Sequence, residues 1–77
     1  MREKIKKFLA QNKNTDGLAD EDDLFEKGFV DSLFALQLIM FLEREFKTHI
    51  PNELIKEDNF RSVDAIVGTV TSLQGQG

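Results

Sequence analysis

The uninterrupted run of residues 32–46 constrains the fold of this chain more than any other part of its sequence. It contains neither glycine nor proline and is rich in Leu, Met, Phe and Glu, most of which favour helices. Asp31 stands immediately before the run, where a short side chain with an acceptor oxygen can cap a helix. The sequence therefore predicts a helix over residues 32–46, the longest in the chain.

Two further segments show the 3.6-residue period of amphipathic helices. In residues 2–12, Ile5, Phe8 and Leu9 share one face, while lysines fill much of the other. Near the other end of the chain, Ser62 is a second candidate N-cap. It precedes an apolar stripe made of Val63, Ile66, Val67, Val70 and Leu73. These patterns predict a helix near each end of the sequence.

The segments between these helices differ in kind. Residues 12–23 are rich in Asn, Asp and Gly, a composition typical of a long loop. The apolar residues that follow should fold back on the helices and pin this loop; they are Leu24, Phe25, Phe29 and Val30. After Pro51, residues 52–56 have room for one or two helical turns. We expect an all-α fold, a four-helix bundle of three main helices and one short helix, with residues 1–77 in a single domain.

Composition excludes several classes of function. The chain has no cysteine and one histidine, His49, so it offers neither a disulfide framework nor a ligand cluster for a metal. The acidic run of residues 20–23 lacks the alternating ligands and glycine of a calcium loop, and we interpret it as solvated. No apolar stretch is long enough for a signal peptide or a membrane span. A cytoplasmic protein without a metal site or a membrane partner is expected.

The formal net charge of −4 argues against nucleic acid as a partner, because binding to phosphates needs a concentrated basic face. The excess of acidic over basic residues is explained equally well by a general contribution to solubility and by a basic protein partner.

The segment from Gly28 to Leu33 is the most informative for function, because it places Ser32 at the start of the longest predicted helix. The first residues of a helix have free N–H groups and the positive end of the helix dipole, so a phosphodiester on such a serine is favoured electrostatically. A serine beside an aspartate is also a routine helix cap. Position alone leaves both interpretations open.

The wider pattern resembles the acyl carrier protein family, which has a D-S-L motif, an apolar helix, an acidic E-x-E-F ending and an I-P pair. The matching residues are Asp31, Ser32, Leu33, Leu36, Leu38, Met40, Leu42, Glu43, Glu45, Phe46, Ile50 and Pro51. Residues 24–30 look like the family's lead-in to its serine, and residues 60–63 look like its entry to the last helix. The resemblance extends over most of the chain, from Ile5 to Leu73.

The resemblance implies that Ser32 is the attachment point of 4'-phosphopantetheine, donated by coenzyme A through a separate phosphopantetheinyl transferase. The arm would hold cargo as a thioester and present it to acyl-loading and acyl-accepting enzymes, which makes the chain a carrier and not an enzyme. The sequence agrees that catalysis is absent, because Ser32 has no evident activating partner and His49 lies far from it in sequence. Nothing in the predicted exposed faces calls for a dimer, so we expect a monomer.

The chain departs from many fatty-acid carriers two and five residues after the serine, where their acids are replaced by Phe34 and Gln37. At 100° per residue, Phe34, Leu38 and Phe41 form one stripe of the long helix. A second stripe, which we expect in the core, comprises Ala35, Ile39, Leu42 and Phe46. The first stripe is either also core or part of a partner-docking surface. The candidate docking residues are Asp31, Leu33, Phe34, Gln37, Leu38 and Phe41.

If the first stripe is exposed, the carrier serves dedicated partners, and polyketide or related secondary-metabolite biosynthesis is the expected pathway. On that interpretation Phe34→Asp leaves the fold intact and weakens cargo loading. A D-alanyl, aminoacyl or fatty-acid-pathway carrier is the alternative within the family. An unmodified acidic helical adaptor is the alternative from another class, and it leaves the pattern around Ser32 as a coincidence.

Overall fold

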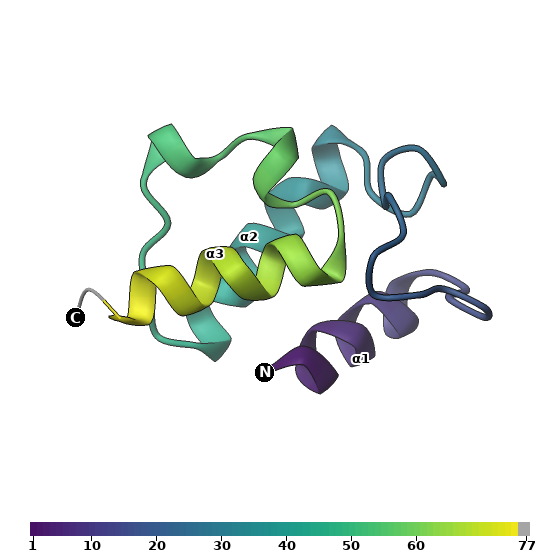
Figure 1. Cartoon of the computed structure of the whole chain (residues 1–77), viewed down its shortest axis with the longest axis horizontal. Coiled ribbons are helices and arrows are strands. Elements are labelled where there is room, and N and C mark those ends of the chain that lie inside the picture. Colours follow the sequence, from purple (N-terminus) through teal and green to yellow (C-terminus); the bar gives the residue numbers. More distant parts are fainter. Residues whose placement is uncertain (76–77) are drawn as a thin grey trace.

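The fold is all-α, as the sequence predicts. The computed structural model describes residues 1–75, and within them the chain forms helices and turns without strands. Three α-helices are joined by loops and two single-turn 3-10 helices (Figure 1), namely α1 (Arg2–Asn12), α2 (Ser32–Glu45), η1 (Asn52–Leu54), η2 (Glu57–Asn59) and α3 (Val63–Gly75). None of these helices combines the length and the apolar character needed to cross a membrane.

Helix boundaries agree closely with the predicted ones, and the differences have local causes. The long helix ends one residue early, because Phe46 leaves helical geometry and Lys47 adopts a positive φ of 51°. The short predicted helix after Pro51 is a single turn, η1. A second turn, η2, was not predicted, because so short an element has no hydrophobic period to reveal it.

Helix α2 occupies the centre of the molecule and is buried along one broad face. Phe34, Leu38, Leu42 and Ile39 follow one another around this face, and all are less than a tenth exposed. Helix α1 covers the Phe34 edge of the face, where the ring of Phe8 stacks on that of Phe34 with 5.6 Å between centroids. The remaining buried residues close the core from α1, the long loop, the segment between α2 and α3, and α3 itself; they are Ile5, Leu9, Leu24, Val30, Ile50, Phe60, Val63, Ile66 and Val70.

The loop before α2 is fixed by buried side chains and by backbone hydrogen bonds. Leu24 and Val30 are buried, and Phe25 and Phe29 pack against the core, which confirms that these residues fold back on the helices. The Leu24 N–H donates to the carbonyl of Arg61 at 2.6 Å, which ties the loop to the segment that enters α3. The chain therefore reaches α2 from a defined direction.

A tight turn within this loop directs the chain into α2. The Asp23 carboxylate accepts hydrogen bonds from the N–H groups of Phe25 and Glu26, both at 3.0 Å. Gly28 ends the turn with a φ of 80°, in the left-handed region that glycine adopts without steric cost. Asp23 thus stabilises the turn that leads into α2, and it also pairs with Arg61.

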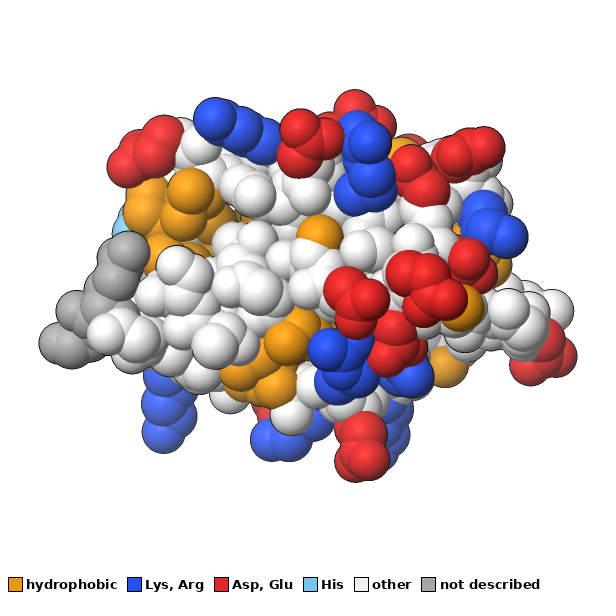
Figure 2. Space-filling model, in the orientation of Figure 1, with side chains coloured by type: hydrophobic (Ala, Val, Ile, Leu, Met, Phe, Trp, Pro, Cys, Tyr) orange, Lys and Arg blue, Asp and Glu red, His pale blue; other side chains and the backbone are white. Residues whose placement is uncertain are grey.

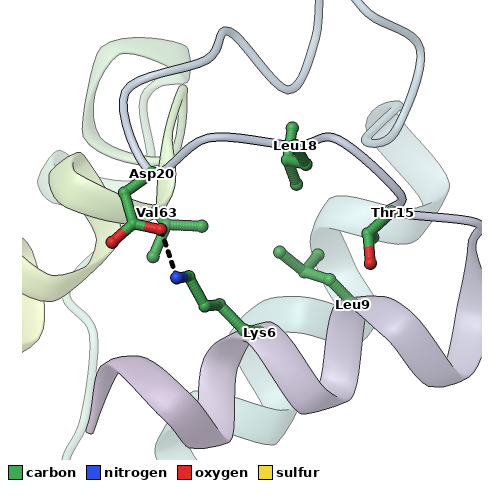
Figure 3. Close-up of a pocket in the computed structure, with 6 residues that line it drawn as sticks. All are labelled: Lys6, Leu9, Thr15, Leu18, Asp20 and Val63. Carbon is green, nitrogen blue, oxygen red and sulfur yellow. Dashed lines mark ion pairs between the residues drawn. The ribbon is translucent and has the colours of Figure 1, made fainter.

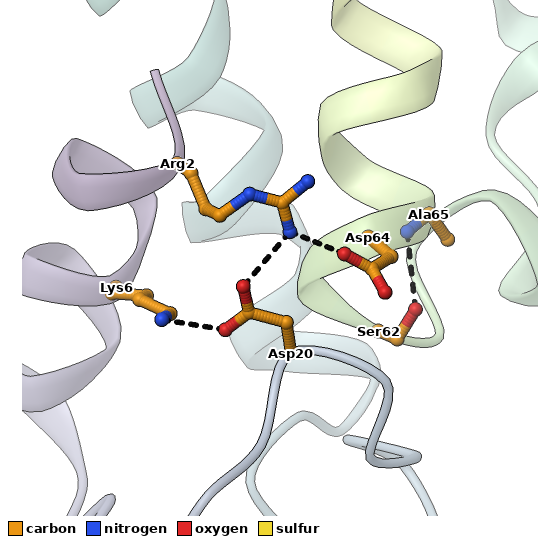
Figure 4. Close-up of polar contacts among 6 residues, drawn as sticks. All are labelled: Arg2, Lys6, Asp20, Ser62, Asp64 and Ala65. Atoms are coloured by element: carbon orange, nitrogen blue, oxygen red, sulfur yellow. Dashed lines mark hydrogen bonds and ion pairs between the residues drawn. The ribbon is translucent and has the colours of Figure 1, made fainter.

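An ion cluster holds the start of α1, the long loop and the start of α3 together (Figure 4). Arg2 contacts the carboxylates of Asp20, at 2.9 Å, and of Asp64, while Lys6 pairs with Asp20 at 2.6 Å. The hydrogen bond from Lys6 is the main cause that lowers the pKa of Asp20 below its ordinary 3.8. Partial desolvation acts in the opposite direction, and the hydrogen bond from Arg2 lowers the pKa further.

Beside this cluster lies a hollow of about 110 Å³ between Leu9 and Leu18 (Figure 3).

The lowered pKa of Asp20 makes the cluster a pH-dependent source of stability. A carboxylate whose pKa is depressed on folding stabilises the fold above its unfolded pKa, and that contribution disappears as the pH falls through the folded pKa. We predict that Asp20→Asn lowers the free energy of unfolding at pH 7, and that this deficit disappears as the pH falls through the lowered pKa of Asp20. Urea denaturation at pH 7 and at a series of acidic pH values measures the difference.

Asp16→Asn is the matched control for this experiment, because Asp16 lies in the same loop, is exposed and forms no ion pair among residues 1–75. An Asp20→Asn deficit of equal size at neutral and acidic pH would contradict the ionic origin of this stability.

Candidate functional site

Ser32 is the first residue of α2, and its side chain is exposed. The preceding Asp31 caps the helix as predicted: its Oδ1 accepts the N–H of Phe34 at 2.8 Å, and its carbonyl accepts the N–H of Ala35 at 2.8 Å. Ser62 caps α3 in the same way, through the N–H of Ala65 at 3.0 Å. Because Asp31 performs the capping, the Ser32 hydroxyl is not needed to hold the helix together.

The backbone around Ser32 suits a phosphate. The hydrogen bonds of residues 1–75 leave the N–H groups of Ser32 and Leu33 without a protein acceptor. These N–H groups lie at the positive end of the α2 dipole, and no acid other than the capping Asp31 lies in the first turn. A phosphodiester on the Ser32 hydroxyl would therefore meet unsatisfied donors and a favourable potential.

Among residues 1–75, no side chain that could act as a base is hydrogen-bonded to the Ser32 hydroxyl. His49 lies beyond the opposite end of α2, where its Nδ1 is 3.2 Å from Oε2 of Glu43 and its side chain is 85% exposed. The same Glu43 oxygen accepts the N–H of Ile50 at 2.9 Å, which fixes the turn after the helix.

The predicted docking stripe is wrong for two of its residues. Phe34 is 6% exposed and Leu38 is fully buried. Phe41 is half-buried, and its ring stacks on that of Phe8 with 4.3 Å between centroids. These side chains face α1, so the stripe is the contact between two helices, and both apolar stripes of α2 belong to the core. The other candidates, Asp31, Leu33 and Gln37, are exposed.

A different apolar stripe of α2 faces solvent. It consists of Leu33, Leu36 and Met40, which are 70%, 58% and 61% exposed. Their spacing of three and four residues places them on one face that starts beside Ser32. The projection of α2 at 100° per residue also places these three residues on one face. Sequence analysis did not identify this face as exposed, because α2 has several apolar stripes and the sequence does not show which of them α1 covers.

Comparison with known proteins points to carrier proteins in each case. The family model described as "Phosphopantetheine attachment site" matches residues 1–70. An aminoacyl carrier protein of Agrobacterium fabrum is 34% identical over 70 residues, covering 91% of this chain and 83% of the relative. A D-alanyl carrier protein of Leuconostoc mesenteroides is 33% identical over 55 residues, covering 71% of this chain and 70% of the relative.

A solved structure is similar over nearly the whole fold. The matched chain comes from the crystal structure of an engineered Bradyrhizobium japonicum glycine:[carrier protein] ligase complexed with a carrier protein from Agrobacterium tumefaciens and AMP. The TM-score is 0.82 at 32% identity, and the match covers 92% of this chain and 99% of the other.

The burial of Phe34 reverses the effect expected of Phe34→Asp. The substitution removes an aromatic core contact and buries a carboxylate, which should cost at least about 3 kcal/mol. A chain of 77 residues has a total stability of roughly 4–12 kcal/mol, so we predict a partly or fully unfolded variant by circular dichroism and urea denaturation. Leu36→Asp places the same charge on the exposed stripe and should stay within about 0.5 kcal/mol of wild type. Equal stability of the two variants would refute this orientation of α2.

Proposed function

The chain belongs to the phosphopantetheine-attachment family of carrier proteins, and we propose that Ser32 holds its 4'-phosphopantetheine arm and that an aminoacyl group is its cargo. The observation that carries the attachment site is the position of Ser32: an exposed hydroxyl at the N-terminus of α2, beside N–H groups that have no acceptor among residues 1–75. Ser62 is half-buried and uses its hydroxyl as a cap, so it lacks these properties. The single domain acts by tethering rather than by catalysis.

In the loading step, the Ser32 oxygen forms a phosphodiester bond as the pyrophosphate bond of coenzyme A breaks. The adenosine bisphosphate portion leaves, and the serine proton passes to the transferase. Asp31 keeps α2 capped throughout, so the free N–H groups stay directed at the new phosphodiester. Once attached, the arm supplies a terminal thiol that holds the cargo as a thioester. Tethering gives that cargo a high effective concentration at any enzyme on which the domain docks.

The aminoacyl cargo is supported by what the relatives are called. Two similar proteins are named as aminoacyl and D-alanyl carriers, and the matched solved chain is held by a glycine ligase with AMP. The polyketide prediction took its support from an exposed Phe34, and the burial of Phe34 removes that support. A cytoplasmic location and a monomeric state stay predictions.

Mass spectrometry tests both halves of the proposal. We expect the intact protein to gain the mass of one phosphopantetheine when it is incubated with coenzyme A and a promiscuous phosphopantetheinyl transferase. Ser32→Ala should abolish the gain, while Ser72→Ala, which alters an exposed serine on α3, should leave it unchanged. A gain that survives Ser32→Ala would refute the attachment site.

The cargo is tested on protein purified from the cell that makes it. The loaded form should carry the added mass of an amino acid, and hydroxylamine should release that mass because it cleaves thioesters. A malonyl group or a longer acyl chain in its place would refute the aminoacyl cargo and leave the attachment site standing.

A further inference from the structure

A groove runs along the seam between α1 and α2, towards the end of α2 that lies away from Ser32. It consists of two adjoining hollows of about 240 Å³ and 270 Å³, which share the side chains of Phe8 and Phe41. These two rings stack with 4.3 Å between centroids and are half-buried, so they form an apolar floor. We call this feature the α1/α2 groove.

The rim of the groove is basic although the chain as a whole is acidic. Lys4 and Lys7 border it from α1, and Arg44 borders it from α2. Glu45 is the only carboxylate in the lining, and it is neutralised by Lys4 at 2.9 Å. Neither Lys7 nor Arg44 forms an ion pair within residues 1–75, so two cations stand uncompensated beside the aromatic floor.

The acids of the long loop lie away from the groove. The loop acids Asp20, Asp22 and Asp23 are engaged in ion pairs or in hydrogen bonds with backbone N–H groups. In Figure 2, the side chains that project from the lower edge are mostly basic with acid among them, whereas acidic side chains gather to the right of centre and along the upper edge. The separation of charge means that the net charge of −4 does not describe the potential at the groove.

The exposed stripe on α2 connects the groove with the proposed attachment site. Met40 lines the groove and also belongs to the stripe that begins at Leu33, next to Ser32. At a rise of 1.5 Å per residue, Met40 lies about 12 Å along the helix from Ser32. A partner that grips the groove therefore holds the Ser32 end at a fixed short distance without covering it.

We propose that the α1/α2 groove binds an acidic amphipathic segment of the enzyme that loads the carrier. An apolar side chain of that segment would cover the Phe8 and Phe41 rings, and its carboxylates would meet Lys7 and Arg44. This inference rests on the proposed carrier function, because it assigns a docking chemistry to one of the carrier's partners. It implies that an acidic carrier recognises this partner through its basic side.

A pair of designed peptides tests the charge and the location together. The first is a helical peptide with a leucine stripe flanked by glutamates, and the second has lysines in place of the glutamates. Titrated into isotopically labelled protein, the acidic peptide should shift the amide resonances of residues 4–8 and 40–44, and added salt should weaken its binding. The basic peptide should bind at least tenfold more weakly.

Matched variants assign the effect to individual residues. Lys7→Glu combined with Arg44→Glu should weaken binding of the acidic peptide about tenfold, through the loss of two attractions and the gain of two repulsions. Lys56→Glu makes a similar change in the turn between η1 and η2, away from the groove lining, and should have no effect. Met40→Gln alters a residue that is 61% exposed, so it should keep the fold and weaken binding about fourfold.

Equal binding of the two peptides, shifts confined to other surfaces, or no binding of the acidic peptide at millimolar concentration would overturn the groove assignment. Attachment of the arm to wild-type protein is weighed separately. If the arm attaches and the acidic peptide does not bind, the groove proposal fails alone. If the arm does not attach to Ser32, the carrier proposal fails whatever the peptides do.

Discussion

The burial of one broad face of α2 is the constraint on which the rest of the structure depends. Leu38 and Leu42 lie one helical turn apart on that face, and neither is exposed to solvent. Each such side chain contributes roughly 1.5–3 kcal/mol when it is removed from water, and a domain this small has few others to rely on. Helix α1 must cover the Phe34 edge of this face, and the remaining elements must cover the rest of it. One stripe of α2 and the end of the helix that carries Ser32 remain exposed to solvent.

The start of α2 is positioned by polar interactions that no helix period describes. Asp23 and Gly28 shape the turn that precedes it, and Asp31 caps it. The ion cluster around Asp20 joins α1 to the loop and to α3, and it thereby fixes the position of the loop that leads into α2. The Ser32 hydroxyl is therefore not needed to cap the helix, which agrees with the proposal that it carries the phosphopantetheine arm. The same arrangement explains how a carrier works without a base of its own.

Much of this fold could be predicted from the sequence, because the three helices have clear periods and two of them have side-chain caps. Asp31 and Ser62 both cap as expected, and the start of α2 is correct to the residue. The orientation of α2 could not be predicted, since Phe34 and Leu36 are equally apolar and only the packing of α1 decides which is buried. The basic groove was missed for a related reason. Its residues come from two helices, and the sequence of neither helix shows how the two pack against each other. The negative net charge also suggested a basic partner, not an acidic one.

Peptide mapping of the modified protein tests the central claim most directly. Trypsin cleaves after Lys27 and Arg44, and the fragment of residues 28–44 contains Ser32 as its only hydroxyl side chain. After treatment with coenzyme A and a phosphopantetheinyl transferase, the account predicts that the added mass lies on this fragment and that fragmentation places it on Ser32. Added mass on the fragment that begins at Ser62, or no added mass on residues 28–44, would contradict it.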